Sequence, residues 1–450
     1  MTALAGFIQS RLFMKRNKFS DISFSRKVDI YSQDFLKCCV YIKGFGLNSN
    51  QFIFTKKLYS MLISNSQLLE DFLDFHGAKN NKNWFFYREL SAAVRHLSLA
   101  GYSQQHISNR LLFYDLDDIQ EFQAEGEEAI RFITRSLMKL APVIIDEARR
   151  LEVKIPKANY SQLSFPGVLT GEMLEFDIDD ENIDQQDKNI VKIASEFLEI
   201  AKDMDQFGIY QKCSPDEIKK MVPLTVNEVA IRQFEMLVHN LQSSFDSYVI
   251  HGGYRYGNRK LKQLRGYFSV VFHLLQIIGR LLHFYERHLH EVGYKEIYVT
   301  VKERLAQYID PDTMMNVATN YGLYYAYKFL TDGKKLAKEI LNQYIERGSI
   351  TVGIPVSRGF HARPSLMVAK IVGHYGGKVD MLVGNDRFDA SSVLDLQWAG
   401  GKIQKENISQ VTFEGDVRAL DDIKILASVN YGEDSMGKGI PLPKTLKYLR

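Results

Sequence analysis

The hydrophobic periodicity of this chain changes abruptly at Gly348, and this change constrains the fold more than any other feature of the sequence. Before Gly348, apolar residues recur at steps of three and four, which is typical of amphipathic helices. The longest such pattern runs from Leu261 to Leu289, and its apolar stripe is too wide for a two-stranded coiled coil. We therefore predict a large all-α domain with this helix buried inside it, followed by a C-terminal domain of another kind.

The helical part is expected in two stretches: residues 1–160, whose first elements the pattern defines poorly, and a helical bundle at 188–347. Prolines and glycines punctuate residues 154–187 between them, which is typical of a loop. An acidic run at 175–184 lies in that loop and is expected to be solvated. We expect the two stretches to form one domain. Its last helices are expected at 296–310, 312–330 and 332–347, and Pro142 is expected to kink an earlier one.

After Gly348, apolar residues come in short runs typical of strands, and helical patterns alternate with these runs. The alternation predicts an α+β domain at 349–434, followed by a C-terminal tail at 435–450. The expected strands and helices are at 350–356, 362–374, 378–383, 392–398, 408–413 and 417–430. The fold class is therefore multidomain, all-α followed by α+β.

Composition narrows the classes of protein that need to be considered. The formal net charge is only +3 over 450 residues, so charge alone gives no argument for nucleic acid or a membrane surface. The pattern predicts no membrane-spanning helix and no signal peptide, because the basic residues near the N-terminus follow its apolar patch. Three cysteines without CxxC spacing favour a reducing, cytoplasmic location. No cofactor is expected.

One histidine lies where a predicted strand gives way to a predicted helix, in the segment 359–364, Gly-Phe-His-Ala-Arg-Pro. At a helix start, the free N–H groups and the positive end of the helix dipole bind anions. Arg363 adds a guanidinium that can donate two hydrogen bonds to a phosphate. A neutral imidazole at His361 can accept a phosphoryl group there and pass it on. The plainer interpretation, a helix-starting histidine without a chemical role, is disfavoured by these neighbours.

The segment 359–365, Gly-Phe-His-Ala-Arg-Pro-Ser, resembles the active-site segment of HPr, the histidine-containing phosphocarrier of the sugar phosphotransferase system. The segment 389–396, Asp-Ala-Ser-Ser-Val-Leu-Asp-Leu, resembles the second signature of that family, whose serine is modified by a regulatory kinase. The resemblance covers residues 349–434, under a fifth of the chain. It implies an open-faced β-sandwich of four antiparallel strands and three helices, in the order β-α-β-β-α-β-α.

The resemblance implies a role for each matching residue. His361 would be the phosphoryl acceptor, through its Nδ1 atom. Arg363 would hold the phosphoryl group, helped by the backbone N–H groups of Ala362 and Arg363. Arg358, where the family usually has Asn or Ser, adds positive charge that would support the phosphate. Ser392 aligns with the regulatory serine, and its alternative role is to cap the helix that follows it.

The resemblance also implies an apolar surface on which enzyme I and sugar-specific phosphotransferase proteins dock. Leu366, Val393 and Leu394 fall at the corresponding positions, and exposed apolar residues around a charged site are typical of such a surface. Two departures from the family pattern lie beside it. Ser391 replaces the usual lysine, and Asp395 brings a negative charge close to the expected docking residues.

These features predict a cytoplasmic phosphoryl carrier, rather than an enzyme with turnover, fused to a helical domain whose own partner the sequence does not identify. The alternative is a regulatory protein, in which phosphorylation of His361 or Ser392 controls what the helical domain binds, with a serine kinase as a further partner. A third interpretation, an enzyme or RNA-binding helical domain with an inactive carrier, has no catalytic constellation to support it. Because the helix at 332–347 leads directly into a strand, we expect the two domains to pack together and to restrict access to His361.

The long helix presents one further set of candidate ligands. His283, Glu286 and His290 are spaced i, i+3 and i+7, so one helix face offers two or three metal ligands. Arg280 and Arg287 share this polar stripe, and their positive charges repel a metal ion. A solvated face without metal is therefore the favoured interpretation.

The loop at 252–260 interleaves tyrosines with basic residues and glycines. Such a composition suits contacts with phosphate or RNA. The loop lacks the lysine-hydroxyl ending of a phosphate-binding P-loop and does not follow a strand, so a plain connection between helices is favoured.

Overall fold

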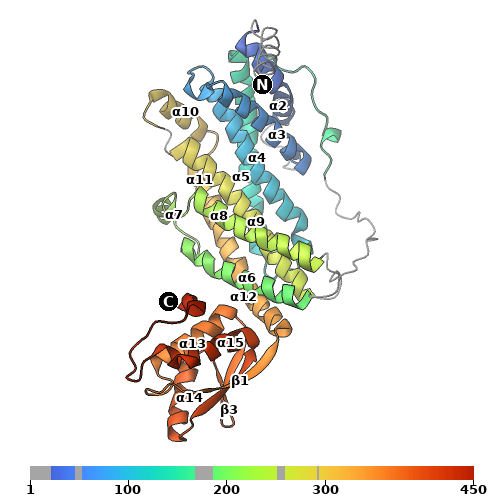
Figure 1. Cartoon of the computed structure of the whole chain (residues 1–450). Helices are drawn as coiled ribbons and strands as arrows, with labels where there is room; N and C mark the ends of the chain where they lie inside the picture. The colour runs from blue at the N-terminus through green and yellow to red at the C-terminus, as the bar shows by residue number, and fades with distance from the viewer. Residues whose placement is uncertain (1–21, 46–52, 168–185, 251–258, 291–292, 450) are drawn as a thin grey trace, which may run out of the picture. The chain divides into compact units, whose positions relative to one another are not determined.

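The computed structural model describes residues 22–45, 53–167, 186–250, 259–290 and 293–449 of the chain (Figure 1). The chain forms two compact units. Unit 1 comprises Met1–Glu175, Phe207–Met236 and Ser269–Lys328, and unit 2 comprises Phe176–Gln206, Leu237–Phe268 and Phe329–Arg450. Residues of the bundle expected at 188–347 thus belong to both units. The acidic run at 175–184 and the loop residues 252–258 lie outside the described residues.

All regular secondary structure in the described residues of unit 1 is helical. Its α-helices are α2 (Phe24–Lys43), α3 (Lys56–Phe75), α4 (Phe85–Arg110), α5 (Gln120–Arg150), α7 (Pro215–Met221), α10 (Glu296–Ala306) and α11 (Pro311–Asn316). Parts of α8 (Glu228–Phe245), α9 (Arg259–Phe284) and α12 (Tyr324–Tyr344) also belong to it. Short 3₁₀ helices cover Ala78–Asn80, Leu111–Phe113 and Gln162–Ser164, and a fourth, Met204–Phe207, has only its last residue in unit 1.

Helix starts in unit 1 follow the expected capping chemistry. The hydroxyl of Thr55 accepts a hydrogen bond from the Leu58 N–H at the start of α3. Before α7, Ser214 and Glu217 form a capping box, in which each side chain accepts from the backbone N–H of the other. α5 runs unbroken from Gln120 to Arg150 with Pro142 inside it.

The core of unit 1 is centred on α4, which contacts both α3 and α5. Apolar side chains of α4 such as Leu90 and Leu97 are fully buried. Gly101 of α4 allows a close approach, because a Cβ atom there would lie 2.4 Å from the ring of Tyr59. The predicted burial of the long helix is confirmed: Val271, Leu275 and other members of its apolar stripe are inaccessible to solvent.

Three segments of the described part of the chain adopt π-helical geometry: η6 (Asp246–Ile250), η7 (Tyr285–His290) and η8 (Val317–Leu323). The predicted helix boundary near residue 331 is wrong, because α12 runs through that position without a break. The sequence around it contains no proline, and Gly333 serves packing instead, since a Cβ there would lie 2.4 Å from the Phe197 ring. The change in helical geometry occurs earlier, at η8.

Unit 2 combines helical segments with the C-terminal α+β domain. Its helices outside that domain are α6 (Gln186–Asp203), η6 and the remaining parts of α8, α9 and α12. The elements of the C-terminal domain are β1 (Arg347–Gly353), α13 (Ala362–Tyr375), β2 (Val379–Val383), β3 (Asp386–Asp389), α14 (Val393–Lys405), β4 (Gln410–Asp416), α15 (Val417–Ser428), η9 (Asn430–Gly432) and η10 (Lys444–Leu449).

The C-terminal domain has one sheet in the order β1-β4-β2-β3, with every pair antiparallel. The described residues are mostly helical with a small four-stranded antiparallel sheet near the C-terminus, which is compatible with the predicted layout of helices followed by a small α+β domain. The element order β-α-β-β-α-β-α is also present, although β1 begins at Arg347 rather than at 350 and α14 extends to Lys405. Alternation explains the sheet: Val379, Met381 and Val383 of β2 are buried, and the residues between them are less so.

The last residues of the chain complete the core of this domain. Leu446 and Leu449 of η10 are buried in the same cluster as Phe360 and Phe413. The ring of Tyr448 stacks on His374 at a centroid distance of 4.0 Å. The segment expected as a separate tail at 435–450 therefore contributes to the domain itself.

Within unit 2, α6 and α12 pack directly against the C-terminal domain, as expected. Asn342 Oδ1 accepts a hydrogen bond from the Lys378 N–H at 2.7 Å, and Ser195 Oγ accepts one from Arg418 at 3.2 Å. A Cβ at Gly376, just after α13, would lie 2.6 Å from a methyl carbon of Leu198. These contacts lie at the C-terminal end of α13, whereas His361 lies at its N-terminal end, about 20 Å away along a helix of this length. The expected restriction of His361 therefore does not arise from these contacts.

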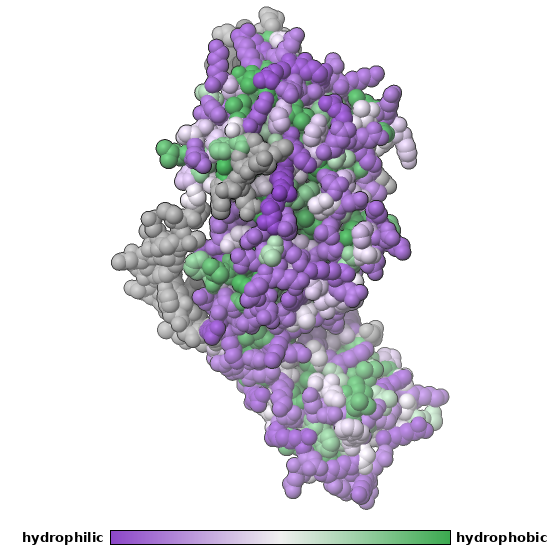
Figure 2. Space-filling model, turned by 180° about the vertical axis from the view of Figure 1, so that it is seen from behind, coloured by the Kyte–Doolittle hydropathy of each residue, from purple (hydrophilic) through white to green (hydrophobic). Residues whose placement is uncertain are grey.

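One helical stretch, Arg259–His290, is long and apolar enough to cross a membrane by length and composition. Within the protein, 72% of its most apolar window is buried, as in the core helix of a soluble protein. The face of the molecule in Figure 2 is mostly hydrophilic, with apolar side chains in small groups. The stretch is thus weak evidence for a membrane span.

Candidate functional site

The loop before α13 holds His361 in a constrained backbone. Arg358 and Gly359 both adopt left-handed conformations, with φ of 59° and 60°. Glycine accepts this conformation freely, whereas an arginine there is strained. Phe360 anchors the loop in the core, where its ring meets that of Tyr431 at 5.1 Å. The chain therefore turns sharply and presents the next residue, His361, at the N-cap of α13.

The imidazole of His361 is oriented by a carboxylate from the far end of the domain. His361 Nε2 lies 3.0 Å from Glu433 Oε2, and the side chain of Glu433 is fully buried while that of His361 is 32% exposed. A carboxylate accepts hydrogen bonds, so the proton is assigned to Nε2. The other ring nitrogen, Nδ1, has no hydrogen-bond partner among the described residues and keeps its lone pair.

Arg363 stands beside this pair in the first turn of α13. Its Nε lies 3.9 Å from Glu433 Oε1, which is buried and lacks a hydrogen-bond partner among the described residues. The guanidinium is 46% exposed and thus reaches solvent. The chain passes close to it at Gly439, where a Cβ atom would collide with Arg363. One buried carboxylate therefore faces both the imidazole and the guanidinium.

The backbone of the first turn completes an anion-binding geometry. The side chain of His361 makes no capping hydrogen bond, and α13 starts at Ala362. The first N–H groups of a helix have no intrahelical acceptor, so those of Ala362 and Arg363 are available to an anion. Arg358 is exposed in the preceding turn, and its carbonyl accepts a hydrogen bond from Gln404. His361, Ala362, Arg363 and Arg358 thus all lie at or just before the first turn of α13.

Ser392 caps α14. Its hydroxyl accepts from the Asp395 N–H and donates to the Asp395 carboxylate, each at 3.2 Å. The neighbouring Ser391 is exposed and donates from its hydroxyl to Asp389. A capping role for Ser392, the alternative recognised in the sequence, is therefore present in the structure.

The expected docking residues fall on two contacting helices, α13 and α14. Leu366 is 42% and Leu394 63% exposed, whereas Val393 is partly buried against the domain core. Trp398 lies one helical turn after Leu394 on α14 and is 69% exposed. Apolar side chains also gather on the face of the C-terminal domain visible in Figure 2.

Sequence reasoning missed Glu433 and Trp398. Glu433 is 72 residues from its histidine partner, and no local pattern distinguishes it from other acidic residues of the chain. Trp398 could have been predicted as a docking residue, because a helical wheel of α14 places it on the same face as Leu394.

The polar stripe of the long helix, with His283, Glu286 and His290, does not form the single solvated face that the sequence predicts. The stripe that begins at His283 is only partly solvated: the side chain of His283 is 23% exposed, and that of the neighbouring His288 is 5% exposed. Glu286 accepts a hydrogen bond from the Glu228 N–H, and His290 stacks on Tyr285. The predicted trio is therefore not assembled; His96 joins His283 and His288 instead.

No family model, curated protein or solved structure matches this chain. Functional roles therefore rest on the geometry of the described residues and on the motif they carry.

Proposed function

We propose that the C-terminal domain is an HPr-like phosphoryl carrier, which accepts a phosphoryl group on His361 and donates it again in a cytoplasmic relay or its regulation. The observation that carries this proposal is the pairing of His361 Nε2 with buried Glu433 at 3.0 Å, which leaves Nδ1 as the reactive nitrogen. The residue lies at the start of α13, beside the guanidinium of Arg363.

The transfer step follows from these positions. The Nδ1 lone pair attacks phosphorus, a new N–P bond forms, and the bond from phosphorus to the donor breaks, with its electron pair leaving on the donor. The proton on Nε2 remains, so the ring gains positive charge that the Glu433 carboxylate stabilises. The reverse attack by an acceptor restores the neutral imidazole. No oxidation or reduction is involved.

The phosphoryl oxygens need donors, because catalysis of phosphoryl transfer rests on positioning and electrostatic stabilisation. Arg363 and the N–H groups of Ala362 and Arg363 supply them at the N-terminus of α13. Arg363 lies 3.9 Å from Glu433, longer than a strong ion pair, and its partial exposure leaves it free to turn toward a phosphate. Arg358 adds positive charge in the preceding turn.

The partners of such a carrier would be an enzyme I-like donor and sugar-specific phosphotransferase acceptors. The exposed side chains of Leu366, Leu394 and Trp398, together with the partly buried Val393, offer apolar surface for docking. The hydrogen bonds of Ser392 to Asp395 disfavour its modification, because a phosphate there would meet the Asp395 carboxylate.

A regulatory role is the second candidate, and the packing within unit 2 favours it. An ordinary small carrier diffuses freely, whereas here α6 and α12 hold the C-terminal domain through Ser195 and Asn342. Phosphorylation of His361 would then control which partner the helical part binds. Pull-downs with His361→Ala and His361→Asp test this role, and identical partner sets for the two variants would argue against it.

The test of the carrier is incubation of the full chain with enzyme I and phosphoenolpyruvate, and separately with phosphoramidate, a small donor that needs no docking surface. We expect acid-labile, base-stable label in the wild type and none in His361→Ala. His374→Ala is the matched control, since His374 lies in the same domain but stacks on Tyr448. Label that survives His361→Ala, or its absence with both donors, would refute the proposal.

A further inference from the structure

Three imidazoles meet inside unit 1, one of them far along the chain from the other two. His96 comes from α4, His283 from α9 and His288 from η7. Each histidine offers one ring nitrogen such that the three nitrogens all lie within 4.8 Å of one another. The rings of His96 and His283 stack at 4.3 Å, and the ring of His288 lies 6.1 Å from each. The cluster is buried or half-buried throughout.

The π-helical segment η7 explains why the third histidine joins the cluster. In an α-helix, residues five apart are separated by roughly 140° around the axis, so His283 and His288 would face different directions. In η7, hydrogen bonds span five residues, and residues five apart come closer to one face. Single turns of π-helix are rare and occur often at functional sites.

Two of the histidines are held by carboxylates through the same nitrogen. His283 Nδ1 lies 2.8 Å from Glu228 Oε1, and His288 Nδ1 lies 2.5 Å from Glu89 Oε2. A carboxylate on one ring nitrogen fixes the tautomer and leaves the other nitrogen, here Nε2, as a ligand. Such carboxylate–histidine pairs are typical of the outer shell of metal sites.

His96 brings an unsatisfied nitrogen. It is 2% exposed, and its Nδ1 is buried without a hydrogen-bond partner among the described residues. Its Nε2 lies 3.0 Å from Arg95 Nη2. Nδ1 is therefore the nitrogen of His96 left for a metal ion, and Arg95 is held away from it by Nε2 and by an ion pair with Glu70 at 2.9 Å.

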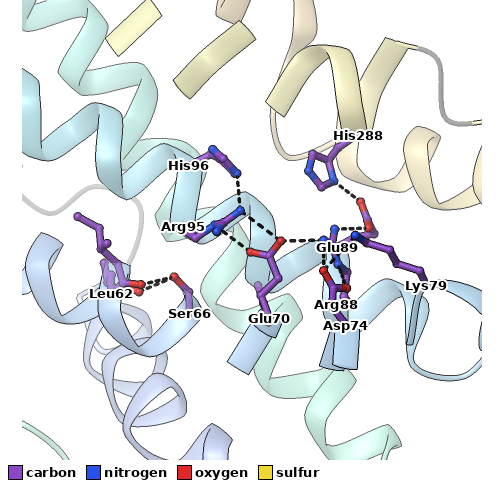
Figure 3. A network of polar contacts seen from close by, with 12 residues as sticks. Leu62, Ser66, Glu70, Asp74, Lys79, Arg88, Glu89, Arg95, His96 and His288 are labelled. Carbon is purple, nitrogen blue, oxygen red and sulfur yellow. Dashed lines mark hydrogen bonds and ion pairs between the residues drawn. The ribbon is translucent and has the colours of Figure 1, made fainter. Parts of the chain in front are cut away.

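On the α4 side of the cluster, Arg88, Arg95 and Lys79 each have a carboxylate partner (Figure 3). Arg88 binds Glu70, Asp74 and Glu89 at 2.7–2.9 Å. Arg287 and Arg232 approach Glu228, at 3.8 and 2.8 Å. Of the two arginines that argued against a metal in the sequence, Arg287 thus faces a carboxylate, whereas Arg280 has no ion pair among the described residues, and burial followed by the charge of Arg232 lowers its pKa.

An open pocket of about 650 Å³ reaches two members of the cluster from solvent, whereas His96 lies outside its lining. His283 and His288 line it, together with Glu89 and Arg95. A hydrated ion can therefore reach the imidazoles without unfolding of the helices. Three imidazoles leave one position of a tetrahedral ion for a solvent molecule from the pocket.

From this geometry we infer that His96, His283 and His288 form a binding site for a first-row divalent cation, with Zn²⁺ as the best fit. Imidazole nitrogen suits Zn²⁺, and its bonds to nitrogen are about 2.0–2.1 Å long. On a tetrahedral ion the ligand nitrogens lie about 3.3 Å apart, so binding draws the three rings together. This inference does not depend on the proposed function of His361.

The test uses the full chain without a histidine tag. Zn²⁺ binding is measured by titration calorimetry and by metal content after gel filtration, and Co²⁺ binding by its visible absorption. We expect one ion per chain in the wild type. His283→Gln and His288→Gln should each weaken binding by more than the 10–100-fold typical of an outer-shell change. Glutamine keeps a donor for Glu228 or Glu89, so each variant is expected to fold, as circular dichroism will check.

The matched control is His273→Gln. His273 lies on the same helix and its ring also packs against another histidine, His106, but Gln276 contacts its Nδ1. This variant should bind like the wild type. A wild-type chain that takes up no stoichiometric metal would overturn the inference. Equal binding by the wild type and both cluster variants would do the same, and would assign the cluster to a network that only stabilises helix packing.

Discussion

In both histidine sites of this protein a carboxylate contacts one ring nitrogen, but the nitrogen that it contacts differs between the sites. At His361, a carboxylate holds Nε2 and leaves Nδ1; at His283 and His288, a carboxylate holds Nδ1 and leaves Nε2. His361 reaches solvent at a helix start, whereas His288 is buried among compensated charges. An accessible single imidazole suits exchange of a group with an outside donor. Several enclosed imidazoles suit a resident ligand.

The comparison also concerns how charge is stabilised. In unit 1, Arg88 is buried and binds three carboxylates, two of which are buried as well. In the C-terminal domain, Arg363 has one carboxylate at 3.9 Å and otherwise faces solvent. The first arrangement fixes structure, because a partner removed from it leaves an uncompensated buried charge. The second leaves a guanidinium free to bind a substrate anion.

The largest expected effect is on stability. Arg88→Ala leaves Glu70 and Glu89 buried without their main cation, and should cost about 3–5 kcal/mol of the free energy of unfolding. The chain has two tryptophans, Trp84 in unit 1 and Trp398 in the C-terminal domain. Urea unfolding followed by Trp84 fluorescence, in a Trp398→Phe background, measures this effect.

The control for that experiment is Arg387→Ala, which removes an exposed arginine paired with Asp380 and Glu414. It should leave stability nearly unchanged, because exposed ion pairs contribute little. If Arg88→Ala were equally mild, the contrast between buried and exposed charge would not hold.

The next effect is on the rate of phosphoryl transfer. Arg363→Ala removes the guanidinium that binds the phosphoryl oxygens, and should slow phosphorylation of His361 about 100-fold. Arg363→Lys should recover only part of the rate, since an ammonium lacks the planar pair of donors. Quench-flow measurement with a fixed donor gives both rates, and an unchanged rate in Arg363→Ala would remove Arg363 from the site.

Glu433→Gln is expected to slow the phosphorylation of His361 less than Arg363→Ala does. The amide oxygen still accepts from Nε2–H, but the negative charge that stabilises the phosphorylated ring is lost. The rate of phosphorylation should fall about tenfold, within the 10–100-fold range for a residue that orients a functional histidine. The far-ultraviolet circular dichroism spectrum should not change. A faster rate would instead show that Glu433 competes with the incoming phosphate.

The smallest effect concerns Ser392. Ser392→Ala removes the N-cap of α14 and should cost about 1 kcal/mol of stability. Ser392→Asn should keep most of it, because asparagine also caps helices. Urea unfolding followed by Trp398 fluorescence, in a Trp84→Phe background, reports on this helix. A neutral Ser392→Ala would leave regulation as the better explanation for the serine.

Local sequence patterns predicted the parts of this protein that depend on local interactions. The change at Gly348, the strand-to-helix position of His361 and the order of elements in the C-terminal domain all follow from short-range periodicity and capping. Glu433 and the contact between His96 and His283 were out of reach, because each joins residues more than 70 positions apart. The π-helical turn at η7 also changed which histidines share a face, since an α-helical wheel pairs His283 with His290 instead.

The most direct measurement is the site of the phosphoryl bond. The full chain, labelled with ¹⁵N-histidine, is phosphorylated and studied by ³¹P NMR, where coupling to nitrogen identifies the bonded atom. The hydrogen bond from His361 to Glu433 predicts one phosphohistidine, linked through Nδ1 of His361 and absent from His361→Ala. A phosphoryl group on Nε2 of His361, or on another histidine with His361 unmodified, would contradict the account.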